Sequence, residues 1–284
     1  MQPAKRMWTP WRMAYVAGDA KEAGCVFCNR FHGSDDRAAL ILHRGAHCFI
    51  IMNLFPYATG HVMIVPNDHV ADPEKASPDA LREMADLLPS CLRAARTALD
   101  CAGFNIGINI GEAAGAGVAD HMHEHIVPRW AGDANFMPML ASTMILPELP
   151  PVTYAKLRAE FERPNGAAIR LVVLDPTARR VLFERAPRNA RLPAALLDVS
   201  VPVWRAAIDA AGSFGVQARV IDWAGAAMVG TPEPGVLLLQ AASNSNVIGG
   251  SWESIDSFDA LGLDDVDATV VGRLGNPTLR EETE

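Results

Sequence analysis

The chain has 284 residues, of which half are hydrophobic and a fifth are charged, a balance that is typical of a folded globular protein and excludes an intrinsically disordered one. Its formal net charge of -8 argues against binding to nucleic acid, although a local basic pocket for a small phosphate ligand stays open. The apolar runs are too short to cross a bilayer and no secretory leader pattern opens the chain, so we expect a cytoplasmic protein that does not bind membranes.

The cysteines and histidines all lie at or before residue 125. Beyond them, Pro164, Asn165 and Gly166 interrupt the chain with residues that are typical of a linker. We therefore predict two domains, residues 1–164 and 165–284. Any chemistry that uses thiols or imidazoles belongs to the first domain.

In the first domain, alternating apolar runs predict four strands, with a helix between the second and third. Ser77 suits the helix cap, Pro78 suits its first position, and Pro89 is expected to kink or split it. The pattern favours an α+β fold, an antiparallel sheet with a helix on one face. The predicted strands are 47–53, 61–66, 104–110 and 123–129, and the helix is 77–103.

In the second domain, the pattern predicts a strand hairpin, a helix, two further strands and a last helix. These segments are 168–175, 179–186, 202–212, 217–225, 235–243 and 254–263.

The five cysteines do not suggest a disulfide framework, because their number is odd and the chain is neither small nor secreted. Cys25 and Cys28 form a C-x-x-C pair, which is typical of a metal knuckle or a redox dithiol. We interpret Cys48, Cys91 and Cys101 as buried apolar side chains.

Three histidines alternate in the stretch "HMHEHIVPRW", residues 121–130. On a strand, successive side chains point to opposite faces, so His121, His123 and His125 share one face. A row of imidazoles suits a metal, a phosphate or a nucleophile. Glu124 falls on the other face, where we expect it to reach solvent or a subunit contact.

This H-x-H-x-H spacing with two following apolar residues resembles the histidine triad family of nucleotide hydrolases and transferases. The resemblance covers about residues 8–140 and includes "NLFPYATGHVMIVPNDH" and "NIGEAAGAGVAD". It implies an enzyme that forms a covalent nucleotidyl intermediate on His123, without an organic cofactor. A homo-oligomer is also expected.

The resemblance further implies a role for several other residues. His121 and His125 complete the catalytic row, with His125 and Asn109 on the phosphate. Asn53 falls where the family contacts the ribose, and Leu42 and Phe49 fall on the walls of the base pocket. Gly115 and Gly117 replace the usual Gln and Ser or Thr, so their backbone N–H groups are expected to bind phosphate. In zinc-containing members, a structural zinc is held by positions that correspond to Cys25, Cys28, His69 and His121.

The segments "MWTPWRMAYV" and "VPRWAGDANFM" resemble the dinucleoside polyphosphate phosphorylases of the family. This branch cleaves diadenosine tetraphosphate with inorganic phosphate as the acceptor, and it makes Trp130 a candidate for the nucleotide pocket. Two alternatives stay open. One is a hydrolase of nucleoside phosphoramidates or adenylyl sulfate, and the other is a nucleotide-binding regulator without catalysis.

The second domain resembles the start of a Nudix hydrolase domain, with an α/β/α arrangement. The metal-binding carboxylates of that family are largely replaced, since Ala206 and Ala210 cannot coordinate a cation. We expect a catalytically silent Nudix-like domain whose role is stability, dimer contacts or closure of the substrate pocket.

Overall fold

The computed structural model describes residues 23–133, 148–163, 168–184, 190–225, 236–243 and 247–255. The chain divides into two compact units, Met1–Leu157 and Arg158–Glu284. The division lies inside helix α5 (Pro150–Phe161), shortly before the predicted boundary at residue 164. None of the helices in the described ranges combines the length and the apolar composition that a membrane span requires.

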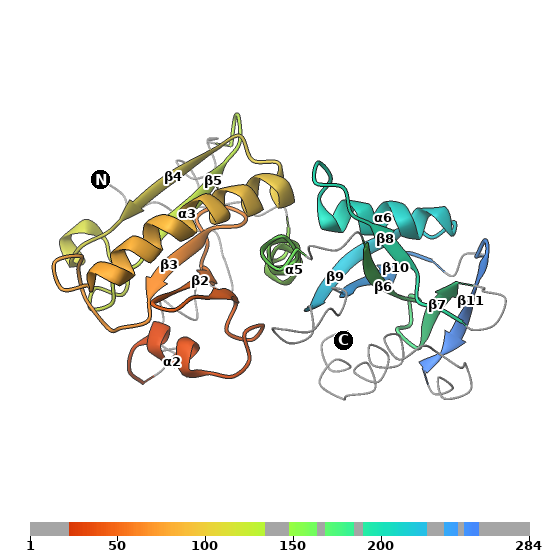
Figure 1. The fold of residues 1–284 in the computed structure, drawn as a ribbon, viewed down its shortest axis with the longest axis horizontal. Helices are drawn as coiled ribbons and strands as arrows, with labels where there is room; N and C mark the ends of the chain where they lie inside the picture. Colours follow the sequence, from red (N-terminus) through yellow and green to blue (C-terminus); the bar gives the residue numbers. More distant parts are fainter. Residues whose placement is uncertain are drawn as a thin grey trace, which may run out of the picture. The chain divides into compact units, whose positions relative to one another are not determined.

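The first unit contains an antiparallel sheet of five strands, which confirms the predicted fold class (Figure 1). The strand order is β1-β2-β3-β5-β4, so β5 lies inside the sheet. Of the histidine row, only His125 lies within β5, and His121 and His123 come directly before it. β1 adds a short strand that the sequence analysis does not predict. The strands are β1 (Ile41–Arg44), β2 (Cys48–Met52), β3 (Val62–Pro66), β4 (Gly103–Ile108) and β5 (Glu124–Arg129).

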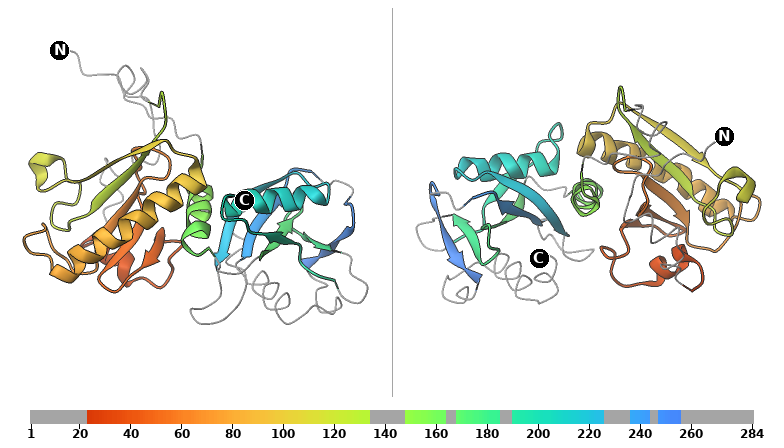
Figure 2. Two further views of the ribbon diagram at one scale, coloured as in Figure 1. Left: turned by 45° about the horizontal axis from the view of Figure 1, so that its top comes forward. Right: turned by 180° about the vertical axis from the view of Figure 1, so that it is seen from behind.

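Helix α3 (Pro78–Leu99) runs along one face of this sheet (Figure 2). The Ser77 hydroxyl accepts a hydrogen bond from the Ala80 N–H at 3.1 Å, as a helix cap requires. Pro89 lies inside this helix, on its exposed side, and does not split it as the sequence allows. The helix ends earlier than predicted, at Asp100, which adopts a left-handed conformation with φ 53°.

The two faces of the sheet have different partners. The Cys48 thiol donates to the Ala80 carbonyl oxygen, so every second residue of β2 from Cys48 onward points toward α3. On the opposite face, Phe49, Ile51 and Met63 pack with Phe27 of helix α2 (Val26–His32). Since Met63 lies directly across from His125, the histidine row belongs to this second face.

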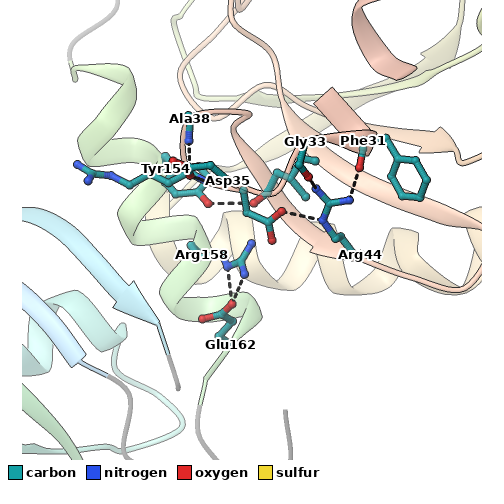
Figure 3. A network of polar contacts seen from close by, with 11 residues as sticks. Phe31, Gly33, Asp35, Ala38, Arg44, Tyr154, Arg158 and Glu162 are labelled. Atoms are coloured by element: carbon teal, nitrogen blue, oxygen red, sulfur yellow. Dashed lines mark hydrogen bonds and ion pairs between the residues drawn. The ribbon is translucent and has the colours of Figure 1, made fainter. Parts of the chain in front are cut away.

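Polar contacts fix the edge of the unit near β1 (Figure 3). Arg44 donates to the carboxylate of Asp36 at 2.7 Å and to the carbonyl oxygens of Phe31 and Gly33. The Tyr154 hydroxyl of α5 donates to the carbonyl oxygen of Ile41 at 2.9 Å. The Tyr154 bond satisfies a carbonyl group of the edge strand β1, and the Arg44 bonds satisfy carbonyl groups at the end of α2.

The second unit is built on a six-stranded sheet with the order β11-β7-β6-β10-β9, in which β8 also pairs with β6. β6 and β10 are parallel, and the other pairs are antiparallel. The elements are β6 (Ala168–Leu174), β7 (Arg180–Glu184), β8 (Ala194–Leu196), helix α6 (Val203–Ser213), β9 (Ala218–Gly225), β10 (Val236–Ala241) and β11 (Gly250–Ser254).

A sheet domain is therefore present where one is predicted, while its Nudix-like character stays a prediction. The last predicted helix, at 254–263, lies almost wholly outside the described residues, as do the N-terminal aromatic segment and residues 134–137 of the post-triad segment.

Candidate active site and metal-binding cluster

Four predicted metal ligands lie together at one end of the histidine row. Cys25 and Cys28 come from the start of α2, His69 follows β3, and His121 precedes β5. One ligand atom from each of the four residues lies within 4.8 Å of the other three. The Cys25 and Cys28 sulfur atoms are 3.3 and 3.6 Å from Nδ1 of His121, and Cys28 is also 3.3 Å from Nδ1 of His69.

The two histidines of this cluster are oriented for ligation through Nδ1. Nε2 of His121 donates its hydrogen to the carbonyl oxygen of Pro66 at 2.9 Å, which leaves the lone pair on Nδ1. Nε2 of His69 faces the carboxylate of Asp120 at 3.5 Å. Donors around a tetrahedral zinc ion are separated by about 3.3–3.8 Å, so the four residues fit such an ion.

His123, the candidate nucleophile, is buried, with 4% of its surface exposed. Its Nδ1 donates a hydrogen bond to the carbonyl oxygen of His121 at 2.9 Å. Burial lowers the pKa of His123, although this hydrogen bond acts in the opposite direction. A neutral ring with its hydrogen on Nδ1 has its lone pair on Nε2, the form that can attack phosphorus.

Phe27, which stands between the two cysteines in sequence, packs against this ring. Its ring centre is 4.9 Å from that of His123 and 5.4 Å from that of His121. The helix that carries the cysteines therefore also contacts the candidate nucleophile.

A fourth histidine, His61, orients His125. The backbone N–H of Tyr57 donates to Nδ1 of His61 at 3.1 Å, and an N–H can only donate. The hydrogen of His61 must then be on Nε2, which donates to Nδ1 of His125 at 3.0 Å. It follows that His125 carries its own hydrogen on Nε2, 3.4 Å from the amide nitrogen assigned to Asn109. With Nε2–H as the donor, we expect the Asn109 amide oxygen to take that position.

Both rings of this pair are held neutral. Burial, followed by the nearby His125 and His123 rings, lowers the pKa of His61 to about 3. Burial and the His123 ring lower the pKa of His125 to about 4. His125 thus offers an uncharged N–H donor at neutral pH.

His61 is absent from the predicted site residues, although the strand pattern indicates its position. His61 precedes Met63 by two positions, and Met63 lies opposite His125, so alternation places His61 on the same face as the histidine row. It is fully buried, with 0% of its surface exposed. A histidine that enters a buried strand requires polar partners, which here are Tyr57, Asn53 and His125.

Three predicted nucleotide contacts are placed differently from the expectation. Leu42 and Phe49 are 1% and 0% exposed, so neither offers a surface to a base; Phe49 instead stacks on Phe31 at 5.1 Å. The Gly115 N–H donates to the carbonyl oxygen of Glu112 at 2.9 Å, so it is already used. Alternation along a strand predicts the face to which a side chain points. It does not predict whether the rest of the chain buries that side chain or occupies a backbone N–H group.

Asn53 lies beside the histidine pair. Its amide nitrogen is 3.3 Å from Nδ1 of His61, and its amide oxygen accepts from the Phe55 N–H at 2.8 Å. Its contact with ribose stays a prediction, as does the binding of phosphate by the Gly117 N–H.

Trp130 and Glu124 point away from the triad. The Trp130 indole N–H donates to the Leu99 carbonyl oxygen at 3.3 Å, at the end of α3. Trp130 lies five positions after His125, about 16 Å along an extended chain at 3.3 Å per residue, so a role in the nucleotide pocket stays a prediction without local support. The sequence predicts that Glu124 reaches solvent or a subunit contact, but its side chain is half-buried. Burial raises its pKa. It lies near Cys91 of α3, and burial together with Glu124 raises the pKa of Cys91 to about 12.

Comparison with known proteins places these features in one family. The HIT domain model matches residues 36–132. The AP-4-A phosphorylase of Mycobacterium tuberculosis is 31% identical over 166 residues, which cover 56% of this chain and 85% of that protein. An adenylylsulfatase of Arabidopsis thaliana is 32% identical over 125 residues, which cover 42% of this chain and 62% of that protein.

Among solved structures, a Zn-bound histidine triad family protein from Mycobacterium smegmatis is 30% identical, with a TM-score of 0.41. The match covers 49% of this chain and 94% of that one. The matched HIT domain holds the whole histidine row, and the phosphorylase match extends over most of that relative. The chain belongs to the histidine triad (HIT) family.

Proposed function

We propose that the first unit is a nucleotidyl-transferring enzyme that acts on dinucleoside polyphosphates such as diadenosine tetraphosphate, with inorganic phosphate as the acceptor. The observation that carries this proposal is the hydrogen bond from Nδ1 of His123 to the His121 carbonyl oxygen, which leaves a lone pair on Nε2. The similarity to an AP-4-A phosphorylase supports the choice of substrate and acceptor.

In the first step, Nε2 of His123 attacks the α-phosphorus. An N–P bond forms as the bond from phosphorus to the bridging oxygen breaks, and ATP leaves with the electron pair of that bond. We propose that the Asn109 amide N–H donates to a phosphate oxygen as charge develops there, and that the Nε2–H of His125 exchanges the Asn109 amide oxygen for another phosphate oxygen.

In the second step, an oxygen of inorganic phosphate attacks the same phosphorus and the N–P bond breaks. ADP is the product and His123 regains its lone pair. The neutral state of the buried histidines suits this cycle, since no proton on Nε2 of His123 must be removed before attack.

We also propose that Cys25, Cys28, His69 and His121 hold a structural zinc ion. The four donors fit a closed tetrahedral site, which leaves no open position for substrate. When bound, the metal supplies cross-linking between α2 and the segments that follow β3 and precede β5. The His121 ring would ligate while its carbonyl oxygen orients His123.

The test is a product assay on diadenosine tetraphosphate with and without inorganic phosphate, combined with intact-mass analysis of the enzyme. We expect ATP and ADP only when phosphate is present, and an adenylyl adduct that maps to His123. His123→Ala should lose the adduct and the turnover, whereas His47→Ala, on an exposed turn, should keep both. Turnover by His123→Ala at the wild-type rate contradicts the proposal.

The same assay separates the alternatives. A phosphate-independent release of AMP from diadenosine tetraphosphate, a phosphoramidate or adenylyl sulfate would indicate a hydrolase. Tight nucleotide binding with no product over hours would indicate a regulator without catalysis.

A further inference from the structure

The loop that carries His61 rests on the last residue of α3. Gly60 has a φ of 74°, a left-handed conformation that favours glycine. A Cβ added to Gly60 would lie 2.2 Å from Cδ1 of Leu99 and 3.6 Å from Cγ of Pro128. The Leu99 side chain therefore occupies the space beside the Gly60 backbone, and it limits movement of this loop toward α3.

Leu99 is itself held from the end of β5. Its carbonyl oxygen accepts the Trp130 indole hydrogen at 3.3 Å, at the point where α3 ends. Carbonyl groups in the last turn of a helix lack partners inside the helix, so this bond satisfies one of them. The turn that carries Trp130 is closed by Arg129, which donates to both carboxylate oxygens of Asp133 at 2.6 and 2.7 Å and to Asn105 at 2.8 Å.

Gly60 is followed directly by His61, which bonds to His125 on the other face of the sheet. The His61 N–H donates to the Ala58 carbonyl oxygen at 3.1 Å, so backbone and ring are fixed within one short loop. The bond from Nε2 of His61 to Nδ1 of His125 is 3.0 Å. A shift of the loop by 1 Å would lengthen this bond beyond the range of a good hydrogen bond.

We propose that Leu99 and Trp130 are positioning residues for the His61–His125 pair, acting from the α3 face of the sheet through Gly60. The inference rests on the proposed function, because it gives the pair the task of binding the transferred phosphate. It assigns to Trp130 a role in orientation and not in contact with the nucleotide.

Two variants with a matched control test the proposal. Leu99→Ala removes the side chain that faces Gly60. Trp130→Phe removes the indole N–H and keeps a smaller aromatic ring. Leu92→Ala is the control. Leu92 lies two turns earlier on the same helix and is half-buried like Leu99. None of its atoms is among the three nearest to a Cβ placed on Gly60.

The first readout is independent of the reaction. Long-range proton–nitrogen spectra of the histidine rings in the full-length protein report which nitrogen carries the hydrogen. We expect the wild type and Leu92→Ala to show His61 and His125 each with the hydrogen on Nε2. In Leu99→Ala and Trp130→Phe we expect His125 to exchange between its two tautomers. An unchanged His125 spectrum in both variants overturns the proposal, whatever the enzyme acts on.

The second readout is turnover of diadenosine tetraphosphate with inorganic phosphate. We expect kcat to fall by about tenfold or more in Leu99→Ala and Trp130→Phe, with KM changed less than about twofold, because misplacement of a catalytic group affects the transition state more than binding. Leu92→Ala should keep the wild-type kcat, and an equal loss in Leu92→Ala overturns the proposal.

A double variant with His61→Gln completes the test. If Trp130 acts through His61, Trp130→Phe should lower kcat no further in that background. A multiplicative loss overturns the proposal. An absence of turnover in the wild type would contradict the proposed function alone, because the spectra would still decide whether the pair is positioned in this way.

Discussion

The carbonyl oxygen of His121 accepts a hydrogen bond from Nδ1 of His123 at 2.9 Å, while the ring of His121 points its Nδ1 toward two thiols. One residue thus joins the metal-binding cluster to the candidate nucleophile. Any change that moves His121 changes the direction in which the lone pair of His123 points. The first prediction follows from this shared position.

Cys28→Ser should lower both the metal content and the thermal stability of the protein. We expect metal content to fall from about one zinc per chain, the value for a single tetrahedral site, and thermal unfolding to begin at a lower temperature. Elemental analysis and calorimetry measure the two effects. Cys101→Ala, at a buried cysteine outside the cluster, serves as the control and should keep the zinc. A Cys28→Ser protein with full zinc content would exclude this cysteine as a ligand.

His61→Gln should lower kcat by about tenfold to a hundredfold with little change in KM. The Tyr57 N–H fixes the His61 ring as a donor to Nδ1 of His125, whereas a glutamine amide can present either its oxygen or its NH2 group there, so the tautomer of His125 is no longer fixed. Steady-state kinetics with varied substrate measures the split. His47→Gln, at an exposed position, should behave as the wild type. Equal kinetics for His61→Gln and the wild type would show that His125 keeps its orientation unaided.

The two buried neutral histidines should make folding stability depend on pH. In the unfolded chain both rings bind a proton below about pH 6.5, whereas their folded pKa values are about 3 and about 4. The unfolded state therefore binds more protons between about pH 6.5 and 4, and the free energy of unfolding falls as pH falls, by up to ~1.4 kcal/mol per pH unit for each ring.

Denaturant unfolding at a series of pH values measures this slope. His61→Gln should reduce the slope of unfolding free energy against pH by the contribution of one histidine ring. His47→Gln should leave this slope unchanged. A slope in His61→Gln that equals the wild-type slope would contradict the burial of a neutral ring at this position.

Glu83 of α3 should contribute to stability through its carboxylate. Its two oxygens accept the backbone N–H groups of Ala46, His47 and Cys48 at 2.9, 2.5 and 2.7 Å, which closes the turn between β1 and β2. Glu83→Gln removes the charge from these bonds and should lower the free energy of unfolding by ~1.5–3 kcal/mol.

Chemical denaturation gives this value. Asp79→Asn is the matched control on the same helix, since Asp79 is an exposed residue that pairs only with Arg82 among the described contacts. Its loss should be below ~1 kcal/mol. A similar loss in both variants would mean that the turn does not depend on Glu83.

Much of the first unit could be predicted from residue patterns. The alternation in 121–129 predicts a strand, of which β5 covers Glu124–Arg129 and includes only the third histidine, and Ser77 and Pro78 mark the start of α3. The four metal-binding donors also lie together as predicted, because the family resemblance supplied a pairing between residues about a hundred positions apart. Local pattern alone does not contain that pairing.

The other features of the site could not be predicted, because they depend on how deeply each side chain is buried and on contacts between residues far apart in the sequence. His61 and His125 are separated by 64 positions, and only the register of β3 against β5 brings them together. Leu42 and Phe49 are apolar and well placed in sequence, but both are buried in the folded chain, and Phe49 packs against Phe31 of α2. Trp130 follows the triad closely, and yet the end of β5 carries it toward α3.

The pairing of β5 with β3 has a consequence for insertions and deletions. His125 lies opposite Met63, and Glu124 lies opposite Ile64 on the face covered by α3. Loss of a single residue between His121 and His125 would reverse this parity, with a carboxylate turned toward the phosphate and imidazoles turned into the apolar layer. The approach segment Gly111–Asp120 precedes the metal-binding His121 and has no such constraint. Residues 121–123 also precede β5, but they join the metal-binding cluster to that strand. Insertions and deletions should therefore be tolerated before His121 and not after it, whichever residue types are inserted or removed.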